Sequence, residues 1–136
     1  MLTRFVDTGG WAAWINPRDI HHQKAVELIN EVWQAEGRLV TTNLVLIELS
    51  ALMIRMKIAK AAQIELIQEI NLDPSVEVTF IDAAKEGRAW ALWKSRLDKD
   101  WTMVDCSSFT LMEEYQLVDA LTPDHHFQQA GFNRLL

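Results

Sequence analysis

Two aspartates each follow a short apolar run that has the composition of a buried strand. Asp7 comes directly after residues 2–6 (LTRFV), and Asp124 comes after residues 117–121 (LVDAL) and the Thr122-Pro123 corner. In a parallel sheet the carboxyl ends of the strands meet at one edge, which is where such folds bind ligands. We therefore expect both carboxylates at that edge, in a position to bind a divalent cation.

Glu48 is the third acid, and its surroundings in the sequence are the most informative. It lies in residues 41–54 (TTNLVLIELSALMI), a helix-forming segment that is apolar on nearly every side. An ionised carboxylate in such a helix is costly unless a partner neutralises it. No basic residue shares its helix face, whose neighbours are Leu44, Val45, Ala51 and Leu52. The partner must therefore be an Arg or Lys from elsewhere, or a metal ion shared with other acids.

Asp105 is the fourth acid, and it opens a predicted helix after the run WTMV. From a helix N-terminus its carboxylate can point toward the same crevice as Asp7 and Asp124. Four carboxylates in one pocket would repel one another, and Mg²⁺ or Mn²⁺, which prefer oxygen ligands, would remove that repulsion. Zinc is less suited, because the chain has no Cys/His cluster with the spacing of a zinc site. Such cations can activate a water for phosphodiester hydrolysis.

Each acid also has a purely structural explanation. An Asp at the end of a strand is commonly a helix cap or a turn residue, and this holds for Asp7, Asp105 and Asp124 taken singly. Glu48 alone fits a buried ion pair as well as it fits a metal ligand. Independent caps need not converge on one edge of a sheet, so the joint arrangement is what favours a metal site.

The elements that must position these acids alternate between strands and helices. Predicted strands cover residues 2–6, 39–41, 76–81 and 117–121. Predicted helices cover residues 11–15, 21–36, 43–56, 59–70, 82–97, 104–115 and 125–130. Thr8 should cap the first helix, and Gly37 should end the second in the left-handed conformation. This order predicts right-handed crossovers and a single α/β domain over residues 1–136, with a mostly parallel sheet covered on both faces.

Composition restricts the class of protein. The chain has 136 residues, of which 49% are hydrophobic and 24% charged, and a formal net charge of −6. This is a globular composition, and it argues against a basic surface that holds nucleic acid. A nuclease whose positive charge comes from bound cations is still compatible with it, because part of the acidity would be ligands. A single cysteine, the lack of a long apolar run and the early acid Asp7 predict a cytoplasmic protein without a membrane segment.

Four sequence blocks resemble those of PIN-domain ribonucleases, specifically the VapC toxin type of bacterial toxin–antitoxin systems. In chain order they are FVDT with Asp7, VTTNLVLIELSAL with Glu48, DWTMVDCSSFTLM with Asp105, and ALTPDHHFQQAGF with Asp124. No single block is decisive, but the four stand in the order of the family and span nearly the whole chain.

The resemblance implies a PIN-like three-layer α/β/α sandwich around the parallel sheet. It also implies an endoribonuclease that cuts RNA with a metal-activated water, using Mg²⁺ or Mn²⁺ held by Asp7, Glu48, Asp105 and Asp124. Toxins of this type commonly form homodimers and are silenced by a cognate antitoxin protein. We expect the same partners for this chain.

Two features depart from the pattern of the family. Gly9-Gly10 stand where the family usually has Ser or Asn followed by a larger residue, which should loosen the first turn of the first helix. Ser107 and Ser108 stand where some PIN nucleases have a further acid.

The loosened first turn motivates an alternative function, a catalytically silent PIN-fold module that binds RNA or protein. A receiver-like signalling domain ranks last, because it needs a Lys after a late strand, where this chain has Asp124.

Two pairs of tryptophans recur at a helical spacing of three residues. Trp11 and Trp14 share one helix face, and Trp90 and Trp93 share another. Such pairs can stack on bases, although packing in a core or at a protein interface is their more common use.

Two groups of polar residues could contact RNA phosphate. His125 and His126 stand beside a proposed ligand, and adjacent histidines point in different directions on a helix, so they do not form a chelate by themselves. Arg55, Lys57 and Lys60 cluster at a junction between two predicted helices, where a solvated surface is the more common explanation.

Overall fold

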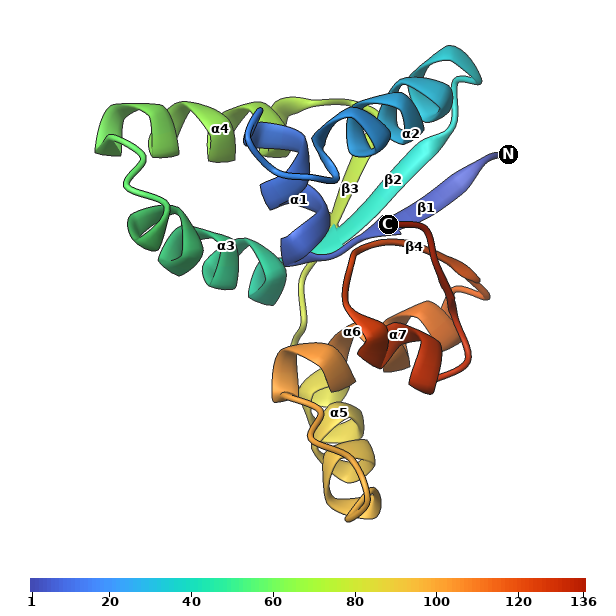
Figure 1. The fold of residues 1–136 in the computed structure, drawn as a ribbon. Helices are drawn as coiled ribbons and strands as arrows, with labels where there is room; N and C mark the ends of the chain where they lie inside the picture. Colours follow the sequence, from blue (N-terminus) through green and yellow to red (C-terminus); the bar gives the residue numbers. More distant parts are fainter.

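A five-stranded sheet forms the centre of the computed structural model, which describes residues 1–136 (Figure 1). All four strand pairings are parallel. In spatial order the strands are β3 (Val76–Thr79), β2 (Arg38–Thr42), β1 (Thr3–Val6), β4 (Asp119–Leu121) and β5 (Asn133–Arg134). The prediction of a parallel α/β sheet is confirmed, while β5, with only two residues, was not predicted.

Helices cover both faces of the sheet. The connections from β1 through β2 to β3 contain α1 (Thr8–Ile15), α2 (His22–Gln34), α3 (Asn43–Arg55) and α4 (Lys60–Leu72). The connections from β3 to β4 and β5 run in the opposite direction across the sheet and contain α5 (Ala83–Ser95), α6 (Met103–Glu114) and α7 (His125–Gln129). Right-handed crossovers therefore place the first four helices on one face and the last three on the other. The result is the predicted three-layer α/β/α sandwich (Figure 1).

The hydrophobic core lies on the two faces of the inner strands. Their side chains are fully or almost fully buried, as expected for a parallel sheet that is covered on both sides: Phe5, Val6, Leu39, Val40, Ala120 and Leu121. On α2 the predicted apolar face is buried except at its end, where Trp33 is 38% exposed. Because these buried strands run parallel, their carboxyl ends meet at one edge of the sheet.

Two of the following three helix termini were predicted from the sequence, at Thr8 and at Gly37. Thr42 caps α3, with its hydroxyl accepting a hydrogen bond from the Val45 amide at 3.1 Å. Thr8 does not cap α1, because it is the first residue of that helix and Asp7 occupies the cap position. The left-handed residue after α2 is Glu36, with φ of 51°, and not Gly37. Glycine is required at 37 for a different reason, since a Cβ there would overlap the carbonyl of Leu2.

α5 extends away from the sheet and packs mainly against α6 (Figure 1). It begins at Asp82, whose carboxylate accepts a hydrogen bond from the Lys85 amide at 2.9 Å. None of the helices in the structure combines the length and the hydrophobicity that a bilayer-crossing segment needs.

Candidate active site

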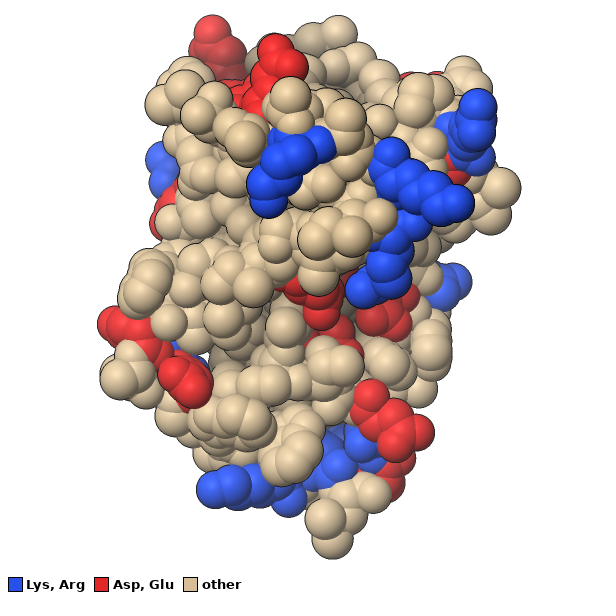
Figure 2. Space-filling model, turned by 90° about the vertical axis from the view of Figure 1, so that its left-hand side faces the viewer, with Lys and Arg blue, Asp and Glu red and all other residues tan.

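The four predicted acids come from four elements that meet beyond the carboxyl ends of β1 and β4. These strands are neighbours, and the strand order reverses between them, which is where open α/β sheets form a ligand-binding crevice. Asp7 and Asp124 are the N-cap residues of α1 and α7, Asp105 lies in the first turn of α6, and Glu48 lies in the middle of α3. Figure 2 shows acidic side chains inside a hollow between the upper and lower parts of the molecule.

Asp7 is the most deeply placed acid, with 5% of its surface exposed. Its Oδ2 accepts a hydrogen bond from the Thr122 hydroxyl at 3.3 Å, but its Oδ1 is buried without any hydrogen-bond partner. The pKa of Asp7 is raised to about 7, mainly by burial and also by the nearby charges of Asp105, Glu48 and Asp124, while the hydrogen bond from the Thr8 amide acts in the opposite direction. A buried, unpartnered carboxylate oxygen among three other acids is the arrangement that a bound cation would satisfy.

The carboxylate of Glu48 is held by a neutral partner. The Thr8 hydroxyl donates a short hydrogen bond to Glu48 Oε1, and the structure contains no ion pair to this glutamate. The buried Arg or Lys partner that the sequence left open is therefore absent. Glu48 is half-buried, and the Thr8 hydroxyl is its partner within the protein.

Asp105 and Asp124 serve as helix caps and also face the crevice. Asp105 forms a reciprocal capping box with Thr102, whose amide donates to Asp105 Oδ2 at 2.9 Å while the Thr102 hydroxyl accepts from the Asp105 amide at 3.1 Å. Asp124 Oδ1 accepts from the His126 amide at 2.9 Å. The other oxygen of each carboxylate makes no hydrogen bond within the protein, so capping and ligand binding do not compete for the same atoms. Burial, and then the charge of Asp124, raise the pKa of Asp105.

His126 joins two of the acids. Its Nδ1 lies 3.2 Å from Asp105 Oδ2 and 3.3 Å from Asp124 Oδ1. His125 is more exposed, and its Nδ1 lies 3.7 Å from Asp124 Oδ1. One ligand atom each from Asp124, His125 and His126 lie within 4.8 Å of one another, which brings imidazole nitrogen to the rim of an otherwise all-oxygen site. The sequence showed that both histidines adjoin Asp124, but not that His126 also reaches Asp105.

Comparison with known proteins identifies the family of the chain. The PIN domain model matches residues 4–133, which is nearly the whole chain. The chain belongs to the PIN domain family. It is 35% identical over 130 residues to the 23S rRNA-specific endonuclease VapC20 of Mycobacterium tuberculosis, in two strains, and the match covers 94% of each protein. The crystal structure of M. tuberculosis VapC20, described as a sarcin–ricin loop cleaving toxin, superposes with a TM-score of 0.81 at 31% identity over 97% of both chains. The predicted resemblance to VapC-type PIN domains is confirmed.

The Gly9-Gly10 pair does not loosen this PIN domain, as the sequence suggested it would. The first turn of α1 is closed by a backbone hydrogen bond of 3.0 Å onto the cap residue. A Cβ at Gly9 would stand 2.7 Å from Pro123 Cδ, and one at Gly10 would overlap the backbone carbonyl of Leu121. Both glycines therefore allow α1 to approach the end of β4, which brings Asp7 close to the segment that carries Asp124.

The absence of a further acid in this PIN domain is explained by burial. Ser107 and Ser108 are completely buried in α6. Ser107 Oγ donates to the Val104 carbonyl at 2.7 Å, and Ser108 Oγ has no partner. A carboxylate at either position would lie unneutralised in the core.

Proposed function

We propose that this chain is a metal-dependent endoribonuclease of the VapC type, acting as the toxin of a toxin–antitoxin pair through a single PIN-like domain over residues 1–136. The observation that carries the proposal is the buried Asp7 Oδ1, which has no partner in the protein and is surrounded by the charges of three further acids. A hydrolase needs such a site to concentrate positive charge next to the phosphodiester, and this acidic chain has no buried cation there to provide it.

The residues present fit a hard divalent cation, Mg²⁺ or Mn²⁺. Asp7, Glu48, Asp105 and Asp124 would hold it through carboxylate oxygens, the donor set that these ions prefer. When bound, the cation supplies positive charge that favours deprotonation of water and stabilises negative charge on the phosphate oxygens. Zinc fits less well, because the two histidines are at the rim and the chain offers no thiolate ligand, its one cysteine being buried.

The protein's own groups orient the ligands before any cation binds. Thr8 fixes Glu48 through its hydroxyl. The Thr122 hydroxyl donates to Asp7 Oδ2 at 3.3 Å and accepts from the Asp124 amide at 3.0 Å, so that it links the ends of β1 and β4. Such supporting hydrogen bonds reduce the reorganisation that ligand binding requires.

An RNA substrate fits the distribution of charge around the crevice. Lys and Arg side chains lie above and below the hollow that contains the acids (Figure 2). Arg55 ends α3, and Lys57 and Lys60 follow it, while Arg18 shares a cavity of about 430 Å³ with Met56 and Ile58. Because the solved relative is a sarcin–ricin loop cleaving toxin, we propose a structured loop of ribosomal RNA as the substrate class.

The antitoxin and a second copy of the chain are the proposed protein partners. α3 and α4 expose large apolar side chains, with Ile47 at 62%, Ile54 at 65% and Ile64 at 48% exposure, beside two cavities of about 230 and 360 Å³. An exposed apolar surface of this kind suits a homodimer interface in a cytoplasmic protein. The acidic crevice suits a basic antitoxin segment. Light scattering that detects only a 15.6 kDa monomer at high protein concentration would contradict the dimer.

Cleavage of RNA by the purified chain, free of antitoxin, tests the enzyme. A hairpin with the sarcin–ricin loop sequence and total RNA are incubated with Mn²⁺, with Mg²⁺ or with EDTA. We expect cleavage only with the cations, its loss in Asp7→Asn, and full activity in Glu113→Gln, an exposed acid on α6. If no RNA of any kind is cut at saturating Mn²⁺, the proposed ribonuclease activity is excluded.

The alternative function, a catalytically silent PIN-fold binding module, was motivated by a loosened turn at Gly9-Gly10. It loses that motivation, because the two glycines have a packing role.

A further inference from the structure

The positive charge and the tryptophans of this acidic chain are concentrated in one segment. Residues 83–101 contain three of the six tryptophans and have five Lys and Arg against three Asp and Glu, a net charge of +2. The remaining eight basic and sixteen acidic residues carry −8. This segment comprises α5 and the turn that leads to α6, and we name it the α5 arm.

Two of the three indoles of the α5 arm are exposed. Trp90 and Trp93 pack edge to face, with ring centroids 5.3 Å apart, and are 38% and 46% exposed. Trp90 Nε1 donates to Glu86 Oε1 at 3.1 Å, which fixes the orientation of the pair. They are therefore not part of the core, in contrast to Trp11, which is buried and donates to Thr41. A rigid aromatic pair in solvent has a free face on which another flat group can stack.

The turn after α5 forms a cavity lined by aromatic and basic side chains. It measures about 570 Å³ and is lined by two aromatic, three basic, one aliphatic and one acidic residue: Trp93, Trp101, Lys94, Arg96, Lys99, Leu97 and Asp100. The Arg96 guanidinium lies 4.8 Å from the centre of the Trp101 ring and is paired with Asp98 at 3.0 Å, so it is already held in place. Lys94 makes no ion pair, and Lys99 lies 4.0 Å from Asp98. Lys94 is thus free for an anionic ligand, and Lys99 can bind one by giving up its ion pair of 4.0 Å with Asp98.

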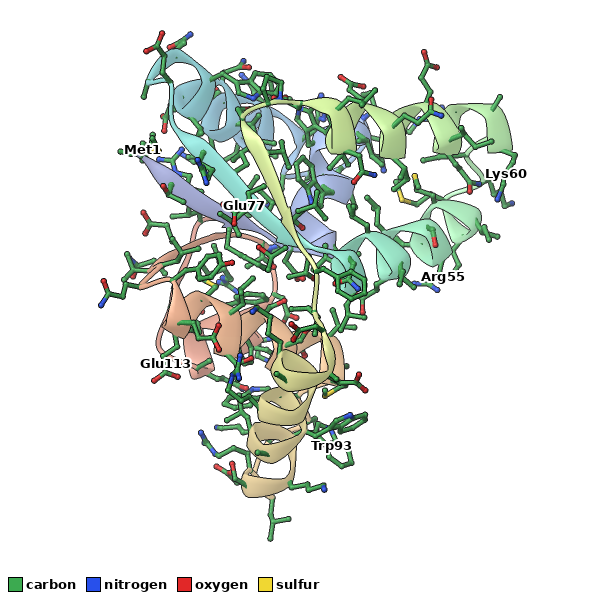
Figure 3. All side chains as sticks on the ribbon, turned by 180° about the vertical axis from the view of Figure 1, so that it is seen from behind. Met1, Arg55, Lys60, Glu77, Trp93 and Glu113 are labelled. Atoms are coloured by element: carbon green, nitrogen blue, oxygen red, sulfur yellow. The ribbon has the colours of Figure 1, made fainter.

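The α5 arm is connected to the acidic crevice. Trp101 stands four residues before Asp105, packs on Phe109 of α6 with centroids 5.0 Å apart, and donates to Gln129 of α7 at 3.0 Å. Figure 3 shows Trp93 projecting from α5 on the side of the molecule where Arg55 ends α3. The end of the arm at Trp101 therefore packs on α6 and α7, the helices whose first residues include Asp105 and follow Asp124.

Indole faces next to lysines suit unpaired nucleotides better than other ligands. Single-stranded nucleic acid is bound by aromatic platforms for the bases and cations for the phosphates, whereas an apolar protein segment would not require the lysines. We propose that the α5 arm binds unpaired nucleotides of the RNA substrate beside the scissile phosphate, with Trp93 stacking on a base and Lys94 and Lys99 contacting phosphates. This inference rests on the proposed ribonuclease function and names the residues that hold its substrate.

Binding is tested in the full-length Asp7→Asn background with EDTA, so that no cleavage is needed. The probe is a fluorescent single-stranded RNA containing all four bases, with a duplex of the same sequence as competitor. We expect Trp93→Ala to weaken binding about 10-fold and Trp93→Phe to retain most of it. Lys94→Gln should reduce the slope of log K against log salt by about 0.7. Trp33→Ala removes an indole of 38% exposure on α2 and should change nothing.

Three outcomes would overturn the inference. They are unchanged RNA binding in Trp93→Ala, equal affinity for the duplex, and a Trp93→Ala defect confined to antitoxin binding, which would make the α5 arm a protein-docking surface. Thermal melting checks that the variants fold, as expected for side chains in solvent. Cleavage by the wild-type chain is measured separately. Absence of cleavage rejects the proposed function, whereas cleavage together with normal RNA binding by Trp93→Ala rejects only the role of the arm.

Discussion

The hydroxyl of Thr8, the first residue of α1, donates its hydrogen bond to the carboxylate of Glu48 in the middle of α3. The two residues are 40 positions apart in the chain, and this contact joins the helix that follows β1 to the helix that follows β2. The side chain of the first residue of α1 thus supports a residue of α3. It holds one proposed ligand at a fixed position relative to Asp7, its neighbour in sequence.

Replacing Thr8 by Val removes the donor and keeps the shape of the side chain. Glu48 then loses its only hydrogen-bond partner, and we expect Mn²⁺ affinity or RNA cleavage to fall about 10- to 100-fold, as for other residues that orient metal ligands. Thr8→Ser retains the hydroxyl and should stay close to wild type. Titration calorimetry with Mn²⁺ and single-turnover cleavage measure the two effects. Equal affinity and activity in Thr8→Val and wild type would show that the hydrogen bond does not position Glu48.

The raised pKa of Asp7 predicts how the stability of the metal-free protein depends on pH. Burial raises the pKa from 3.8 in the unfolded chain to about 7, so the folded state binds this proton more tightly than the unfolded state. The resulting stability is fully present below pH 4 and is lost as the pH rises through 7. The upper limit of the loss is about 4 kcal/mol. Urea denaturation in EDTA between pH 4 and 8 measures it.

Asp7→Asn is the control for this pH dependence. The amide cannot ionise, so the metal-free variant should lack this loss and should be more stable than wild type at pH 8. Added Mn²⁺ should restore the stability of wild type at pH 8 but not raise that of Asp7→Asn. A wild-type denaturation midpoint that rises between pH 5 and 8 in EDTA would contradict the assignment of a buried, protonated Asp7.

Sequence periodicity predicted the long elements of the fold and missed those that depend on tertiary contacts. β1 to β4 and all seven helices were predicted from the sequence, whereas β5 spans only Asn133–Arg134 and is held by pairing with β4. The left-handed residue after α2 was assigned to Gly37 by its type, although Gly37 is needed to avoid the carbonyl of Leu2. Residue type alone does not distinguish these two uses of glycine.

The acids of the site could be predicted because the sequence itself shows where each stands relative to a strand or helix. The hydroxyl groups that bind these acids could not be predicted. Thr8 and Thr122 contact Glu48 and Asp7 only after β1, α3 and β4 have assembled, and a hydroxyl has no pattern in the sequence that indicates its partner. The exposure of Trp90 and Trp93 depends in the same way on α5 leaving the sheet.

Gly10 and Gly87 give a matched pair of glycine-to-alanine substitutions within helices. Alanine favours the helix by about 1 kcal/mol at both positions. Gly87 in α5 has no atom within 4 Å of the added Cβ, so Gly87→Ala should be stabilising by up to that amount. Gly10→Ala should be destabilising, because its Cβ overlaps the backbone of Leu121 and must push α1 away from β4. Urea midpoints compare the two, and a Gly10→Ala variant as stable as Gly87→Ala would refute the close packing of α1.

His126 and His125 allow a comparison of neighbouring imidazoles. Nδ1 of His126 lies 3.2 Å from Asp105 Oδ2 and 3.3 Å from Asp124 Oδ1, while the His125 ring is largely in solvent. We expect His126→Ala to reduce cleavage about 10-fold, because both carboxylates lose a group that orients them. His126→Asn, which keeps a donor near the place of Nδ1, should recover part of the activity, and His125→Ala should have little effect. Initial rates of RNA cleavage at saturating Mn²⁺ measure all three variants. Equal losses in His125→Ala and His126→Ala would mean that the histidines act through substrate phosphate and not through Asp105.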